Sequence, residues 1–167
     1  MSVATKEGVK NVKKDKEAII HEKLVENYNK YYRIAFGYVH SEEDAMDIVQ
    51  EGAYKAIFHA EKLKKTEYAD TWICRIMMNE AIEFLRKNRR DYVELELCET
   101  GKEESYEDVD LKKAIDALPV KEKTVVQMRY FEEMSLEQIA RMLNENLSTV
   151  KSRLYRALAK LKLSLEV

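Results

Sequence analysis

The sequence predicts an all-α protein made of two small helical domains joined by an acidic linker. Glycine occurs four times and proline once in 167 residues, too few turn residues for a β-sandwich or a βαβ fold. Apolar residues recur at spacings of three and four along most of the chain, which is the helical period. One strongly acidic stretch, residues 91–109, separates two such regions.

The net charge of −2 is a sum over unlike parts of the chain. Residues 1–90 carry a net charge of +2, residues 91–110 of −8 and residues 111–167 of +4. The acidic stretch therefore hides a basic excess in the two folded parts, so the near-neutral total does not argue against nucleic-acid binding. A solvated connecting loop with no further role explains the acidic stretch equally well.

The first domain is predicted to span residues 18–90, after a polar, lysine-rich and flexible tail over residues 1–17. Its first helix is predicted over residues 18–38. The apolar face of that helix is formed by Leu24, Tyr28, Tyr31, Tyr32, Ala35 and Phe36.

A second helix is predicted over residues 42–60, because the hydroxyl of Ser41 precedes three carboxylates that favour a helix N-terminus. The residues expected to be buried are Ala45, Ile48, Val49, Gly52, Ala53, Ala56 and Ile57. The opposite face shows Asp47, Gln50, Glu51 and Tyr54. Taken alone, this polar face indicates simple solvation.

A third helix is predicted over residues 69–89, with Thr66 as a candidate cap. Trp72 is more typical of a core anchor than of a base-stacking platform, and Asn79 falls near the middle of the helix. Cations precede and end this helix, at Lys62, Lys64 and Lys65 and at Arg86, Lys87, Arg89 and Arg90. The second cluster suits the helix dipole and also a phosphate backbone.

The second domain is predicted over residues 110–167. Short helices are expected at 110–118, before Pro119, and at 120–131. Ser135 and Gln138 form a capping-box pattern at the start of a further helix. Asn144, Glu145 and Asn146 break that helix, and Ser148 is expected to cap the last one. Two helices joined by a three-residue turn predict a helix-turn-helix.

The last helix is expected to expose a basic face, which consists of Lys151, Ser152, Arg153, Tyr155 and Arg156. Such a helix fits the major groove, where guanidinium groups bind guanine edges or phosphates. A plain helical hairpin with a solvated basic face is equally compatible with the spacing.

Catalysis and cofactors are not indicated by the residues. Cys74 and Cys98 lie in different segments without zinc-ligand spacing. We find no nucleophile–base pair, metal cluster or glycine-rich phosphate loop, so we expect no enzyme, no metal, no cofactor and no small-molecule substrate. The chain shows no signal peptide and no run of 18 apolar residues, which predicts a cytoplasmic protein.

Three motifs together resemble a bacterial sigma factor of the extracytoplasmic-function group. They are DAMDIVQEGAYKAI at 44–57, TWICRIMMNEAIEFLRKNRR at 71–90 and ALPVKEKTVVQMRYFEEMSLEQIARMLNENLSTVKSRLYRALAKL at 117–161. The resemblance covers roughly residues 20–163, with the motifs in the order and spacing of that family.

The resemblance implies roles for residues in the first domain. The residues Asp47, Gln50 and Glu51 would contact the coiled coil of the beta-prime subunit of core RNA polymerase. The loop residues Lys62, Lys64, Lys65 and Thr66, with Asn79, would capture an unstacked base of the minus-ten element. The nearby phosphates would be held by four cations, Arg86, Lys87, Arg89 and Arg90.

The resemblance also assigns the last helix to the minus-thirty-five element, through Ser148, Thr149, Lys151, Ser152, Arg153, Tyr155 and Arg156. Two positions depart from the family pattern. Asn144 stands where the turn usually has glycine, and Lys151 stands where an arginine would bind guanine bidentately.

The resemblance implies a promoter-specificity subunit whose partners are core RNA polymerase, promoter DNA and an anti-sigma factor, commonly membrane-anchored. Two other functions remain open from the residues. A stand-alone helix-turn-helix regulator would bind an operator without polymerase and would leave residues 44–57 unexplained. A helical interaction protein that never touches DNA would tolerate charge reversal at Arg153 and Arg156.

Overall fold

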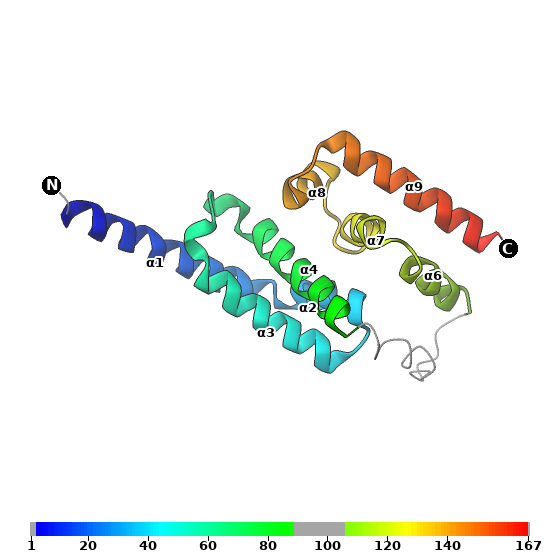
Figure 1. Cartoon of the computed structure of the whole chain (residues 1–167), viewed down its shortest axis with the longest axis horizontal. Helices are drawn as coiled ribbons and strands as arrows, with labels where there is room; N and C mark the ends of the chain where they lie inside the picture. Colours follow the sequence, from blue (N-terminus) through cyan, green and yellow to red (C-terminus); the bar gives the residue numbers. More distant parts are fainter. Residues whose placement is uncertain (1–2, 89–105, 167) are drawn as a thin grey trace. The chain divides into compact units, whose positions relative to one another are not determined.

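A computed structural model describes residues 3–88 and 106–166 of the chain. In this part of the chain the elements are α-helices with short 3₁₀ and π turns, without a strand (Figure 1). The contacts divide the chain into two compact units, Met1–Ala81 and Ile82–Val167. The all-α prediction is confirmed. The domain boundaries proposed from the sequence stay predictions.

The first unit contains three whole helices, most of a fourth and two short turns. The helices are α1 (Val3–Glu26), α2 (Tyr28–Val39), α3 (Glu42–Phe58) and α4 (Ala69–Lys87), and the 3₁₀ turns are η1 (Ala60–Lys62) and η2 (Thr66–Tyr68). Helix α2 packs on α3, and α1 contacts α2, α3 and η1. The fully buried side chains that fill the core include Ile20, Tyr31, Ile34, Ala45, Ile73 and Met77.

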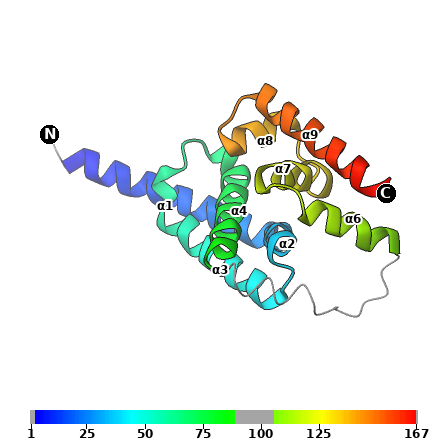
Figure 2. The same ribbon diagram turned by 45° about the vertical axis from the view of Figure 1, so that its right-hand side comes forward.

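Helix α1 begins at Val3, inside the stretch for which the sequence predicts a flexible tail. Alanine, lysine and glutamate are good helix formers, and no proline interrupts this stretch. The stretch lacks an apolar stripe, so the hydrophobic period could not reveal it. Both views show the N-terminal half of α1 extending beyond α2, α3 and α4 (Figures 1 and 2). Lys13 forms an exposed ion pair with Glu61 at 3.6 Å, a contact of small energetic value.

The helix predicted over residues 18–38 is interrupted at Asn27, where α1 ends and α2 begins. The backbone bonds continue through the break, since the Asn27 N–H donates to Lys23 and Tyr31 donates to Asn27. The predicted apolar face is partly wrong as well. Tyr31 and Ala35 are buried, but Tyr28 and Phe36 are 45% and 36% exposed. The rings of Tyr28, Tyr32 and Phe36 instead stack along the helix surface.

Helix α3 begins as the sequence predicts. The Asp44 N–H donates to the Ser41 hydroxyl oxygen at 3.3 Å, and three carboxylates occupy the first turn. The buried face consists of Ala45, Ile48, Val49, Gly52 and Ala56. Gly52 permits close approach to α4, because a β-carbon there would collide with the Met77 thioether. Thr66 caps no helix and begins η2 instead.

The second unit contains the helix-turn-helix. Its elements are α6 (Tyr106–Asp116), α7 (Val120–Val126), the π turn η3 (Gln127–Phe131), α8 (Leu136–Leu143) and α9 (Leu147–Leu165). Helix α9 contacts α6, α7 and α8. The buried side chains between these helices include Val125, Met128, Ile139, Met142, Val150 and Leu154. The predicted helix-turn-helix is therefore present as α8, a short turn and α9.

Two boundaries in this unit differ from the prediction. Helix α6 begins at Tyr106, inside the predicted linker, because the acidic residues that indicated a linker also favour the first turn of a helix. The remaining linker residues, 91–105, lie outside the described residues. Ser148 does not cap α9, since Asn146 is the N-cap residue and α9 already begins at Leu147.

Candidate functional site

The outward face of α3 combines carboxylates with aromatic rings. Asp47, Gln50 and Glu51 are exposed, as the sequence predicts. One and two turns further along the same face, Tyr54 and Phe58 are 62% and 59% exposed, and their ring centroids lie 5.8 Å apart. Exposed aromatic rings beside charged groups are typical of protein-binding surfaces rather than of plain solvated faces.

An open pocket of about 240 Å³ lies between the end of α3 and the outer face of α4. Its lining residues are Lys55, His59, Lys62, Trp72, Arg75, Ile76, Asn79 and Glu80. The pocket brings together Lys62 and Asn79, two residues that the sequence resemblance assigns to one DNA element. Three cations, one indole ring and one amide line the cavity, together with the Glu80 carboxylate that pairs with Lys55. The indole ring, the amide and the two remaining cations are groups that can bind a splayed nucleobase and its phosphate.

The sequence missed most of the lining of this pocket. Trp72 is half-buried and lines the pocket, so its expected role as a core anchor is only partly right. Lys64, Lys65 and Thr66 are exposed in the segment that follows η1, but they do not line the pocket. The ammonium of Lys65 lies 5.9 Å from the centroid of the Tyr68 ring, within reach of a cation–π contact.

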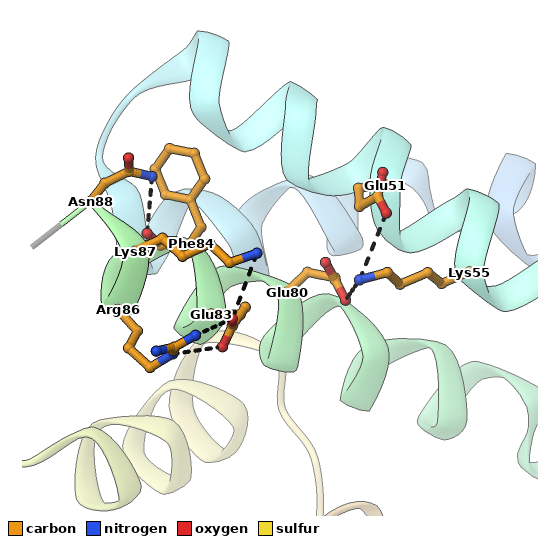
Figure 3. A network of polar contacts seen from close by, with 8 residues as sticks. All are labelled: Glu51, Lys55, Glu80, Glu83, Phe84, Arg86, Lys87 and Asn88. Atoms are coloured by element: carbon orange, nitrogen blue, oxygen red, sulfur yellow. Dashed lines mark hydrogen bonds and ion pairs between the residues drawn. The ribbon is translucent and has the colours of Figure 1, made fainter.

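A chain of ion pairs connects the outward face of α3 with the pocket (Figure 3). The Lys55 ammonium donates to Glu80 Oε1 at 2.7 Å and lies 3.7 Å from Glu51 Oε1. The hydrogen bond to Glu80 raises the pKa of Lys55, and Glu51 adds to the effect. Lys55 is therefore shared between a carboxylate of the outward face and a carboxylate of the pocket.

At the C-terminal end of α4, Glu83 binds two cations of the same helix, Arg86 and, at 3.6 Å, Lys87 (Figure 3). Arg86 donates from Nε and Nη2 to the two carboxylate oxygens of Glu83, at 2.9 and 2.6 Å. This contact holds the pKa of Glu83 at about 2. Arg86 is thus an exposed cation with a carboxylate already beside it. Arg89 and Arg90 lie outside the described residues.

Asp70 fixes the start of α4, and hence the pocket wall. Its carboxylate accepts hydrogen bonds from Tyr31 at 2.7 Å, Asn27 at 3.0 Å and Lys30 at 2.7 Å. Burial opposes charge on Asp70, but the bonds from Lys30 and Tyr31 outweigh it and lower the pKa of Asp70. Burial, reinforced by Asp70, raises the pKa of Tyr31 far above its usual range. The break at Asn27 therefore places three donors around one carboxylate.

The start of α8 and the turn that follows α8 have the geometry that the sequence predicts. The Gln138 N–H donates to the Ser135 hydroxyl at 3.1 Å, and the Gln138 amide oxygen accepts from the Ser135 N–H at 2.8 Å. Asn144 adopts the left-handed conformation, with φ of 53° and ψ of 47°. Asparagine tolerates this conformation without glycine, which explains how the turn survives the departure from the family pattern.

Most of the predicted recognition residues lie on the exposed face of α9. Ser148, Lys151, Ser152, Tyr155 and Arg156 are exposed, and Thr149 is half-buried. The prediction that Arg153 is exposed is wrong. Its side chain is only 11% exposed and binds both carboxylate oxygens of Glu145 in the turn. The sequence could not show this, because the two residues are eight positions apart and belong to different elements.

Comparison with known proteins gives the family of the chain. The family model described as Sigma-70 region 2 matches residues 24–91, and the model described as Sigma-70, region 4 matches residues 108–161. The chain belongs to the sigma-70 family. Its relatives include ECF sigma factors, and the prediction of this group is confirmed. Sigma factors are regulatory proteins of transcription initiation rather than enzymes.

Two relatives from Bacillus subtilis match almost the whole of this sigma factor. RNA polymerase sigma factor SigV is 39% identical over 157 residues, which are 92% of this chain and 95% of that protein. ECF RNA polymerase sigma factor SigW is 28% identical over 93% of this chain and 94% of that protein. The fold is similar to that of the sigma factor RpoE from Bartonella quintana, solved with the anti-sigma factor NepR. That comparison has a TM-score of 0.68 and 21% identity, and covers 88% of this chain and 96% of the other.

Two features are absent from the part of the chain that the structure describes. Within residues 3–88 and 106–166, no helix combines the length and apolar character needed to cross a membrane. The same residues contain no group of three or more histidine, cysteine, aspartate or glutamate side chains arranged to hold a metal ion.

Proposed function

We propose that this ECF sigma factor docks on core RNA polymerase through the outward face of α3. The residues carrying the contact are Asp47, Gln50 and Glu51, and the occupant is the coiled coil of the beta-prime subunit. The proposal is supported by the exposure of these residues and by the aromatic pair beside them. Aromatic side chains supply most of the binding energy at many protein interfaces, with charged groups around them.

The proposal assigns the pocket between α3 and α4 to one unstacked base of the minus-ten element. The observation that carries it is the meeting of Lys62 and Asn79 at one cavity that also presents Trp72. An aromatic face stacks on any base, and an amide forms hydrogen bonds with its edge. Exposed Lys64, Lys65 and Thr66, with Arg86, hold the neighbouring phosphates in this proposal.

The exposed face of α9 reads the minus-thirty-five element as duplex DNA in the same proposal. Lys151, Ser152, Tyr155 and Arg156 reach base edges, and Ser148 and Thr149 lie at the start of the helix, where phosphates bind. The support is the helix-turn-helix geometry and the exposure of these residues.

An anti-sigma factor completes the set of proposed partners. RpoE of Bartonella quintana was solved with the anti-sigma factor NepR, and CnrH was solved with the cytosolic domain of CnrY. By analogy, an anti-sigma factor anchored in the membrane would hold this chain away from polymerase. Copurification of this chain with membranes of the native host tests this part of the proposal. If no membrane-anchored anti-sigma factor binds the chain, only core polymerase will copurify with it.

The function is tested by runoff transcription with purified core polymerase on a library of promoters. We expect specific transcripts whose templates share minus-ten and minus-thirty-five sequences. A stand-alone regulator would instead bind its operator without polymerase and yield no transcripts.

The docking face is tested by the double change Asp47→Lys and Glu51→Lys. We expect weaker binding to core polymerase with an unchanged circular dichroism spectrum. The matched control reverses two exposed charges on α1, Glu22→Lys and Glu26→Lys, and should leave core binding unchanged. Equal binding by the α3 variant and wild type would contradict the assignment.

A further inference from the structure

The turn of the helix-turn-helix carries an ion pair that the proposed DNA contacts do not use. Glu145 lies in the turn, and Arg153 lies in the second turn of α9. Both terminal guanidinium nitrogens of Arg153 donate to the Glu145 carboxylate, with Nη2 3.0 Å from Oε1. The two side chains are 11% and 28% exposed. The pair therefore connects the turn to α9 in a place largely shielded from water.

The backbone bonds of the turn fix where α8 ends. The Glu145 N–H donates to the Ala140 carbonyl oxygen at 2.9 Å, and the Asn144 N–H donates to that of Arg141 at 3.2 Å. These bonds join the turn to α8, whereas the Glu145 side chain joins it to α9. A bidentate arginine–carboxylate pair also fixes direction, because its two parallel bonds must stay in one plane. The pair is thus placed to set the angle at which α9 leaves the turn.

The helical period separates Arg153 from the outward face of α9. Val150 and Leu154 point inward and are at most 6% exposed. Residues two positions from each lie on the opposite side of a helix with about 3.6 residues per turn, which is where Ser152 and Arg156 are found. Arg153 lies between these faces, on the flank that adjoins the turn.

We propose that Glu145 and Arg153 are positioning residues, which hold α9 so that Lys151, Ser152, Tyr155 and Arg156 meet the minus-thirty-five element. Arg153 itself does not contact DNA. This inference rests on the proposed function and gives Arg153 a role other than the DNA contact that the resemblance implies. It also gives Glu145, an acidic residue beside a DNA-binding helix, a reason to be there.

The experiment measures the affinity of holoenzyme, made from core polymerase and the full chain, for two duplexes. One is the promoter that the runoff library selects, and the other has its minus-thirty-five element scrambled. We expect Glu145→Gln and Arg153→Gln each to lower the affinity ratio of the two duplexes roughly three- to tenfold. The affinity ratio of the double variant should be no lower than that of the more strongly affected single variant, because the two changes remove the same interaction.

If Arg153 contacted DNA directly, Glu145→Gln would change the affinity in the opposite direction. Glu145→Gln would then free the guanidinium and raise affinity, and this result would overturn the inference. Arg153→Gln would also lower the slope of log affinity against log salt by about 1 if a phosphate contact were lost. We expect that slope to stay unchanged. Glu137→Gln, the same charge change at an exposed position of α8, measures the general gain from removing an acid near DNA.

A charge swap keeps the test decisive if the single variants unfold. Glu145→Arg combined with Arg153→Glu should recover part of the affinity ratio lost in Arg153→Glu, and no recovery would contradict positioning. The wild-type measurement tests the proposed function separately. Equal wild-type affinity for both duplexes would refute minus-thirty-five reading, whereas a wild-type preference that rises in Glu145→Gln would refute only the positioning role.

Discussion

Two arginines of this chain each bind a glutamate through two nitrogens, in opposite settings. Arg86 and Glu83 belong to one helix, three residues apart, with side chains 69% and 41% exposed. Arg153 and Glu145 belong to a helix and a turn, with side chains 11% and 28% exposed. Water and salt compete with the first pair but reach the second poorly. We therefore expect a phosphate to compete with Glu83 for Arg86, whereas the Arg153 guanidinium is held against the turn by Glu145.

A third charged contact joins residues that lie far apart in the sequence, because the Asp70 carboxylate accepts hydrogen bonds from three donors on or near α2. The loss of this carboxylate should have the largest effect on stability. Asp70→Ala leaves Tyr31 and Lys30 without their shared acceptor, so we expect a loss of about 2–3 kcal/mol in the first unit. Hydrogen exchange of the α2 and α4 amides measures it, because exchange reports opening of individual regions. Asp47→Ala, at an exposed carboxylate, is the control. Equal exchange in the two variants would contradict a structural role for the cluster.

The pH dependence of this loss follows from the lowered pKa of Asp70. A carboxyl whose pKa is lower in the folded chain than its unfolded value of about 3.9 adds stability above that value. The contribution disappears as pH falls through the folded pKa. We therefore expect the exchange difference between wild type and Asp70→Asn to be constant near neutral pH and to shrink below about pH 4. A difference that grows in acid would show that the sign is wrong.

The two arginines themselves should differ in stability. Arg153→Ala removes a shielded bidentate pair and should cost about 1–2 kcal/mol in the exchange of α8 and α9 amides. Arg86→Ala removes an exposed pair within one helix and should leave the exchange of amides at the end of α4 almost unchanged. Similar costs at both sites would remove the distinction on which the comparison depends.

The smallest effect is expected at Glu83. Glu83→Gln leaves Arg86 without its carboxylate, so holoenzyme should bind single-stranded minus-ten DNA about twofold more tightly at low salt. The gain should fade at high salt because the contact is exposed. Titration of a labelled oligonucleotide at two salt concentrations measures it, and Glu22→Gln on α1 is the matched control. A larger gain in the control would exclude a local effect at Arg86.

The features that were predicted from the sequence are those whose cause is local. Ser41 and Ser135 cap helices through bonds to residues three positions away, and such short patterns are visible in a string of residues. Asn144 is the residue type that a left-handed turn tolerates. The two sigma regions were recognised for a related reason, since each motif lies within one continuous segment.

The features that were missed depend on contacts between distant residues or on helices without an apolar stripe. Asp70 meets Tyr31 across 39 positions, and Arg153 meets Glu145 from another element, so neither pair leaves a periodic signal. The break at Asn27 was invisible because helix formers continue on both sides of it. The sequence predicts a flexible tail over residues 1–17 for the complementary reason, that the N-terminal half of α1 carries no apolar stripe.

Helix α4 holds the pocket and Arg86 at a fixed separation. It spans 19 residues, and from Asn79 at the pocket to Arg86 it rises about 10 Å over two turns. In the proposed function, such a rigid helix would set the distance between the held base and the held phosphate, independently of any loop. Its spacing is counted in residues, so inserting one alanine between these positions would turn Arg86 by about 100° around the helix axis. In the proposed complex, Arg86 would then no longer face the DNA phosphate next to the base held in the pocket, although no side chain had been removed.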